Sequence, residues 1–399
     1  MDYIIIAGFA LIIIFSYLFD ALARKTKFPA VILLIFLGLF LKMVAIYYDF
    51  NSLDRELDEL IKVLGKVGLI LIVLEGALEL DINRSKFDII RKSFISALFT
   101  LLICAFSIAC VLHYGLDVRF EIALYESIPL SIISSAVAIP SAASLLGKAK
   151  EFVVYESTFS DILGIIIFSF VSGAIAPESD GFTFGAFLYL GFEVVIVFIV
   201  AIIVTFLLLE LIGRIEHHVK FFLIMAILML AYVIASRFHL SALIIVFVFG
   251  LVMSNSDFML PKFLKKRIAA NQAEKELEQF HLLTAETTFF VRTFFFLTFG
   301  YLINPEMFLN VYNYLNGGII LAVILVTRLL YFLIADRKNT FPIAFIAPRG
   351  LITILLFLQI PESYQNIIVN EKVLLIVILG TLFIMLIGVL NFSKGKQKS

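Results

Sequence analysis

The chain has 399 residues, of which 62% are hydrophobic and 16% are charged, and its mean hydropathy is +1.08. Soluble globular domains are about 45–50% apolar and about 25% charged, so this composition excludes an ordinary soluble protein. The 31 basic and 31 acidic residues cancel, which removes the net positive charge typical of nucleic-acid-binding proteins.

Apolar runs of about 20 residues, the length at which a helix crosses a bilayer, recur along the whole chain. They are continuous rather than alternating, which favours helices over a β-barrel. The sequence therefore predicts an all-α polytopic membrane protein. We expect about thirteen spans, at 3–22, 28–48, 61–80, 92–114, 120–146, 152–173, 183–211, 219–236, 240–254, 283–303, 316–334, 341–360 and 371–391.

Lysines and arginines gather in alternate connections between these spans, for example at 24–27, 84–92 and 394–398. Because cytoplasmic loops are rich in basic residues, this alternation predicts an N-terminus outside and a C-terminus in the cytoplasm. An odd number of spans satisfies both. The whole chain, 1–399, is predicted to form a single domain in the cytoplasmic membrane, with a charged cytoplasmic connector at about 255–281.

The third span carries two embedded acids, Glu75 and Glu79, one turn apart toward its cytoplasmic end. They could form a funnel that draws cations from the cytoplasm. An interfacial or paired role is the alternative. In the tenth span, Arg292 is a further embedded charge, whose partner the sequence does not identify.

Proline interrupts the fifth span at Pro140 and the twelfth at Pro348, which is followed by Arg349 and Gly350. Proline inside a helix removes a backbone hydrogen bond, and incidental kinks are one explanation. However, each proline lies in the middle member of a three-span group, and an odd number of spans between the groups inverts one relative to the other. Such interrupted helices in inverted repeats mark the midplane site of secondary transporters, so we expect two interrupted, crossing helices. Arg349 would offset the negative end of a half-helix.

The sixth span contains Asp161 near its middle, where an ionisable side chain indicates a functional site by default. Ser157 precedes it by one turn, so the hydroxyl and the carboxylate share a helix face. These hard oxygen ligands suit an alkali cation or a proton. The alternative is a structural carboxylate held in a buried ion pair.

Glu156 in the same span and Arg328 in the middle of the eleventh could pair inside the membrane. A buried pair needs good geometry to offset the desolvation of both charges. For these two residues we expect a structural role.

These segments together resemble the monovalent cation/proton antiporters, on the sodium/proton exchanger branch. The resemblance covers nearly all of the chain. It includes the Leu74–Leu80 phrase, the sixth-span signature of Glu156, Ser157, Ser160 and Asp161, the Phe-rich run Phe289–Gly300, Arg328, and Arg349 with Gly350.

The family pattern in the sixth span is Glu-Ser-x-x-Asn-Asp, so Ser160 here replaces an asparagine. The resemblance implies that Asp161 carries both cation and proton, that Ser157 helps to ligate the ion, and that Glu156 pairs with Arg328. Ser160 is a further candidate ligand.

The fifth-span crossover also departs from the family, which commonly has Thr-Asp-Pro where this chain has Ala138, Ile139 and Pro140. The family's aspartate offsets positive half-helix ends, and Ile139 cannot do so. The Ala138 carbonyl can still contribute a ligand, because that contact comes from the main chain.

The activity implied is electroneutral exchange of one proton for one Na⁺ or Li⁺, with K⁺ as a further candidate, since one titrating carboxylate gives one-for-one stoichiometry. The resemblance also implies elevator-like movement of a core, about 92–173 and 316–391, against a dimer-forming scaffold, about 1–80 and 183–303. A monovalent cation, a proton, the lipid bilayer and a second copy are the expected partners. The sequence contains no P-loop, Ser-His-Asp set or metal-ligand cluster, so neither an enzyme, a cofactor nor a transition metal is predicted.

Two rival functions stay open. A sodium-coupled symporter of an organic anion could use the positive half-helix ends that Ile139 leaves bare, with Arg349 assisting. A degenerate relative could serve as a non-transporting sensor or a channel, although the intact Asp161 argues against degeneration.

Overall fold

The computed structural model of the chain describes residues 2–26, 29–48, 54–142, 145, 147–175, 182–214, 221–237, 242–255, 259, 273–303, 310–335, 340–365 and 368–395, and these contain helices but no strands. The helices are α1 (Asp2–Thr26), α2 (Ala30–Tyr47), α3 (Asp54–Leu78), α4 (Phe87–Leu116), α5 (Phe120–Ser131), α6 (Ser135–Ala142), α7 (Lys148–Ala174), α8 (Phe184–Arg214), α9 (Phe221–Arg237), α10 (Ala242–Ser254), α13 (Ala273–Leu302), α14 (Val311–Ala335), α15 (Thr340–Ile343), α16 (Leu351–Phe357) and α17 (Glu371–Gly395). Two 3-10 turns are also present, η2 (Arg84–Lys86) and η4 (Glu362–Tyr364).

Each expected span coincides with one helix, except that the fifth and the twelfth are each a pair, α5/α6 and α15/α16. Within the described residues, eight helices or joined helix pairs are long and apolar enough to cross a membrane unaided, and shorter apolar helices such as α9 and α10 accompany them. The chain is therefore a multi-pass membrane protein. Most of the predicted connector at 255–281 lies outside the described residues, apart from Asn255, Met259 and 273–281.

The surface of α2 illustrates how the apolar sequence is divided between lipid and protein. Phe36, Phe40 and Met43 are each about half exposed, at 45%, 60% and 55%, whereas Ile32 and Ile35 are buried. Because the exposed side is as apolar as the buried one, this helix suits a hydrocarbon environment rather than water.

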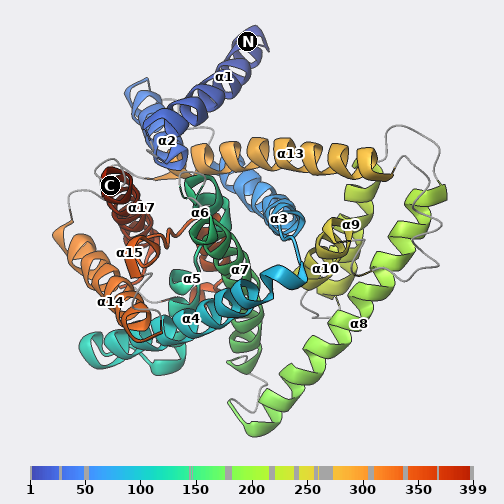
Figure 1. Cartoon of the computed structure of the whole chain (residues 1–399). Coiled ribbons are helices and arrows are strands. Elements are labelled where there is room, and N and C mark those ends of the chain that lie inside the picture. The colour runs from blue at the N-terminus through green and yellow to red at the C-terminus, as the bar shows by residue number, and fades with distance from the viewer. Residues whose placement is uncertain are drawn as a thin grey trace.

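The helices pack in two groups (Figure 1). In one, α4, α5, α6 and α7 pack together with α14, α15, α16 and α17, and in the other, α13 packs on α2 and α3 while α10 packs on α3, α8 and α9. Helix α3 joins the two, because it also contacts α6, α7 and α16. The division into a moving core and a dimer-forming scaffold stays a prediction.

The break in the fifth span was predicted at Pro140, and this is wrong. The helix is interrupted at 132–134, between α5 and α6, and both Pro140 and Ala138 lie inside α6. Proline is accepted there because the carbonyl that it leaves unbonded, that of Ala136, receives a hydrogen bond from Arg292 instead. The twelfth span is interrupted at 344–350, so Pro348 lies in the break as predicted.

Candidate ion-binding site

The two interrupted spans cross at their breaks. The backbone N–H of Ser134, in the gap between α5 and α6, donates to the carbonyl of Pro348, in the gap between α15 and α16, at 2.9 Å. Gly350 allows this approach, because a Cβ at its position would lie 2.7 Å from Ser134 Oγ. The predicted pair of crossing helices is therefore present.

Three consecutive amides at this crossing each bind a different partner. Ile133 N donates to Ser160 Oγ at 2.9 Å, Ser134 N to Pro348, and Ser135 N to Asp161 Oδ2 at 3.1 Å. Ser135 is the first residue of α6, where N–H groups have no partner within the helix and the dipole is positive. Asp161, on α7, therefore offsets the positive end of α6.

One carboxylate oxygen of Asp161 accepts a hydrogen bond and the other does not. Its side chain is only 3% exposed, and Oδ1 has no hydrogen-bond partner among the described residues. The same is true of two buried hydroxyls from the two interrupted spans, Ser134 Oγ and Thr353 Oγ1. A buried carboxylate oxygen without a partner is costly unless a cation or a proton satisfies it.

The three other predicted ligands, Ser157, Ser160 and Ala138, each have identifiable contacts. The hydroxyl of Ser157 is fully buried and donates to the carbonyl of Val153 at 2.8 Å, which leaves its lone pairs available. The hydroxyl of Ser160 accepts from Ile133, so it supports the break in the fifth span. Ala138 is buried inside α6, and its N–H donates to the carbonyl of Ser134.

Arg349 contacts the end of a half-helix. Its guanidinium donates to the carbonyls of Leu130 at 2.8 Å and Ser131 at 3.2 Å, the last two residues of α5, and to Ala347 at 2.8 Å. These carbonyls carry the negative end of the α5 dipole, which the buried cation offsets.

Glu156 and Arg328 form a buried ion pair with two contacts, Nη1 to Oε1 at 3.1 Å and Nη2 to Oε2 at 2.8 Å. Ser96 on α4 donates to the same carboxylate at 2.6 Å. Arg328 also donates to the carbonyls of Ile343, Ala344 and Ile346, which follow or end α15. The pair thus joins α7 to α14 and to the unwound part of the twelfth span.

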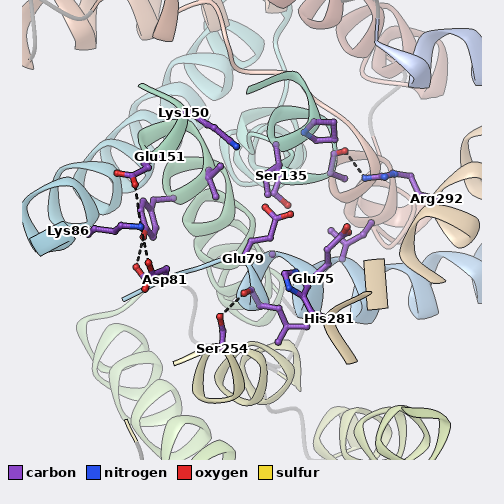
Figure 2. A pocket seen from close by; sticks show the side chains of 18 of the residues that line it. Glu75, Glu79, Asp81, Lys86, Ser135, Lys150, Glu151, Ser254, His281 and Arg292 are labelled. Atoms are coloured by element: carbon purple, nitrogen blue, oxygen red, sulfur yellow. Dashed lines mark hydrogen bonds and ion pairs between the residues drawn. The ribbon is translucent and has the colours of Figure 1, made fainter. Parts of the chain in front are cut away.

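A cavity of about 910 Å³ leads toward this crossing, and Figure 2 shows its lining. Glu75 and Glu79 both line it, as do Ser135 and Arg292, whereas Asp161 does not. The Asp81–Lys86–Glu151 cluster lies at one side of the cavity and Arg292 at the other, with Glu79 and Ser135 between them (Figure 2). Ser135, whose amide binds Asp161, is therefore part of the lining of this cavity.

Two contacts of the site and one buried acid on α5 were not predicted from the sequence. The contact of the Ser135 amide with Asp161 uses a main-chain N–H, so no residue type in the sequence indicates it. Two features of the sequence pointed to the contact of Arg292 with Ala136. One is an arginine inside an apolar span, and the other is Pro140, which leaves the carbonyl of Ala136, four residues earlier, without a donor. Glu126, fully buried on α5, is a further embedded acid that was not among the predicted site residues.

The sequence matches the model of a protein family described as sodium/hydrogen exchanger, transmembrane, over residues 10–393. The chain belongs to the sodium/hydrogen exchanger family. This family comprises transporters rather than enzymes.

Solved structures show the fold of this exchanger family member independently. The sodium proton antiporter MjNhaP1 from Methanocaldococcus jannaschii at pH 8 is similar with a TM-score of 0.69 at 20% identity, over 98% of this chain and 99% of that one. A second MjNhaP1 structure, from a three-dimensional electron microscopy map, gives 0.67 at 20% identity, over 98% and 95%. A comparison with curated proteins gives no match.

Proposed function

We propose that this sodium/hydrogen exchanger family member exchanges Na⁺ or Li⁺, with K⁺ as a third candidate, for H⁺ at Asp161. The observation that carries the proposal is the unequal environment of the Asp161 carboxylate. Its Oδ2 is held by the Ser135 amide, whereas its buried Oδ1 has no partner among the described residues. Family membership supports cation/proton exchange as the reaction.

One carboxylate of this kind can bind a cation or a proton but not both. The cation would bind Oδ1 with the hydroxyl of Ser157, one turn away on the same face of α7, as a further oxygen ligand. The proton would neutralise the same oxygen. If the empty, charged carboxylate does not cross the membrane, only the two loaded forms reorient, and exchange follows.

The cavity lined by Glu75 and Glu79 is the proposed route to the site. Two carboxylates facing a cavity raise the local cation concentration, and Ser135, whose amide binds Asp161, lines the same cavity. By the distribution of basic loops, this is the cytoplasmic side, the N-terminus lies outside, and the protein lies in the cytoplasmic membrane.

Three further features belong to the proposal. A single exchanging carboxylate gives one-for-one, electroneutral stoichiometry. Elevator-like movement of the predicted core against the predicted scaffold provides alternating access, and the scaffold forms a homodimer. Glu156 and Arg328, whose charges are paired with each other, hold the core together rather than bind the ion.

The anion symporter finds less support. It needs a bare positive helix end and a free arginine at the crossing. However, Asp161 already occupies the N-terminal amide of α6, and the guanidinium of Arg349 donates to three carbonyls.

The test is exchange in liposomes that carry a pH-sensitive dye inside. We expect the wild-type protein to move protons when Na⁺ or Li⁺ is added, at the same rate whether or not the membrane potential is clamped. Asp161→Asn, which keeps the shape but cannot ionise, should abolish the signal.

The matched control is Asp117→Asn, the same chemical change at an exposed position. Asp117 has φ 56°, a left-handed conformation that asparagine adopts readily, so this variant should fold and transport normally. Cation-driven proton movement that persists in Asp161→Asn would refute the assignment of the carrier. A potential-dependent rate would refute the stoichiometry alone.

A further inference from the structure

Helix α6 contains Pro140, which removes one hydrogen bond from the helix backbone. In an α-helix the N–H of residue 140 would bond to the carbonyl of residue 136, but Pro140 has no N–H. The side chain of Arg292 supplies a donor instead, with Nη1 at 2.9 Å from the Ala136 oxygen. Figure 2 shows this contact at the edge of the cavity.

Arg292 reaches α6 from a distant part of the chain. It lies on α13, which packs on α2 and α3, whereas α6 packs on α7. The hydrogen bond therefore links one group of helices to the other. Its acceptor, Ala136, is the residue after Ser135, whose amide holds Asp161.

We propose that Arg292 is a positioning residue: it stands in for the missing N–H of Pro140 and so holds the first turn of α6, with its Ser135 amide, against Asp161. The transport part of this inference rests on the proposed function, whereas the positioning of α6 does not.

Pro140 makes the hydrogen bonding of α6 depend on a contact from α13. An alanine at 140 would bond Ala136 within the helix, and α6 would need no contact from α13. With proline at 140, the first turn of α6 is stabilised by the hydrogen bond from Arg292. That bond depends on how α13 and α6 lie relative to each other. A rearrangement that separates them releases the turn next to the cation carrier.

A fixed positive charge in the cavity could instead act only by repelling cations. Glu75 and Glu79 line the same cavity as Arg292, so its charge is partly balanced there. The two roles differ in one respect. Repulsion depends on charge and is indifferent to residue 140, whereas positioning depends on the donor and vanishes when residue 140 has its own N–H.

The experiment compares Arg292→Gln in two backgrounds, the natural chain and Pro140→Ala. Pro140 is exposed toward the cavity, so alanine there removes little packing. Amide hydrogen–deuterium exchange of the peptide covering 135–142 reports the hold on α6 and needs no transport. The concentration of Na⁺ that gives half-maximal proton movement reports the site.

We expect Arg292→Gln in the natural chain to speed exchange of the α6 amides by about tenfold, the effect of losing one charge-assisted hydrogen bond, and to raise the half-maximal Na⁺ concentration. In the Pro140→Ala background, the same substitution should change either quantity less than about twofold. Arg91→Gln, which removes an exposed arginine on α4, is the control for charge and should leave the exchange of 135–142 unchanged.

Equal effects of Arg292→Gln in both backgrounds would overturn the proposal, as would no effect on 135–142 in the natural chain. If Arg292→Gln does not fold in the natural chain, recovery of folding in the Pro140→Ala background would support the proposal, whereas failure to fold in both backgrounds would overturn it. If Asp161→Asn transports normally but the hydrogen exchange behaves as expected, the proposed function fails and the positioning role stands.

Discussion

Arg328 has more hydrogen-bond partners than Glu156 does. Replacing Arg328 should therefore lower the free energy of unfolding by more than replacing Glu156. In Glu156→Gln, the guanidinium keeps its contacts with the carbonyls of Ile343, Ala344 and Ile346, and the new amide oxygen can still accept one hydrogen bond. In Arg328→Met, a carboxylate that is only 1% exposed loses its counter-charge, although Ser96 still donates to it.

The magnitudes follow from these contacts. Removing one partner of a buried ion pair costs about 3–5 kcal/mol, and Glu156→Gln belongs at the low end because the arginine keeps its acceptors. Arg328→Met belongs at the high end. It also deprives the carbonyls of Ala344 and Ile346, at about 1 kcal/mol each, whereas Ile343 keeps a bond from the Ile346 N–H. We therefore expect the free energy of unfolding to fall by about 3 kcal/mol in Glu156→Gln and by about 7 kcal/mol in Arg328→Met.

The assay is thermal unfolding in detergent, followed by the fraction that stays monodisperse after heating. At about 2 °C per kcal/mol, the apparent Tm should fall by about 6 °C in Glu156→Gln and by about 14 °C in Arg328→Met. Equal falls would show that the carbonyl contacts contribute nothing. Variants that keep the wild-type Tm but change the apparent cation affinity would refute the structural role and place the pair in the ion site.

Two further predictions concern packing and the break in the fifth span. A Cβ on Gly300 would lie 2.2 Å from the carbonyl oxygen of Ile35 on α2, so Gly300→Ala should lower stability by about 1–3 kcal/mol, whereas Gly318→Ala, with no atom within 4 Å, should be neutral or stabilising in the same unfolding assay. Ser160→Ala leaves the buried Ile133 N–H without an acceptor and should cost about 1–3 kcal/mol, whereas Ser160→Thr, which keeps the hydroxyl, should recover most of it. Wild-type stability in Gly300→Ala, or in Ser160→Ala, would contradict the corresponding contact.

Hydropathy predicted the positions of the helices because each apolar run must satisfy its backbone internally within lipid. The pairing partners Glu156 and Arg328 were predicted for a related reason. A charge in an apolar segment needs a partner, and only a few embedded residues could supply one. The crossing of the two interrupted spans followed from the inverted placement of their prolines.

The location of the break could not be read from Pro140. A proline leaves one carbonyl of its helix without a donor, and here Arg292, 156 residues from Ala136 in the sequence, supplies a donor to it. The interruption at 132–134 is held instead by the main-chain N–H groups of residues 133–135, which donate to Ser160, Pro348 and Asp161, and such N–H donors are common to every residue except proline. A sequence pattern therefore gives them no signal.

The charges at the crossing bear on the proposed stoichiometry. Glu156 cancels Arg328, and the α5 carbonyl end is offset by Arg349, so the charge that varies at the α6 end is that of Asp161. Binding Na⁺ or binding H⁺ adds the same single positive charge there. The two loaded forms then have equal net charge, and the electrostatic cost of moving them through a low-dielectric membrane is similar, whereas the empty form differs by one charge. Ser160 matters in this balance because it stands beside Asp161 where a second acid could carry an extra proton, and a serine cannot; Ile139 adds no titrating group either. On this account, the departure from the family pattern at 139 leaves one-for-one exchange intact and alters only the field in which the cation binds.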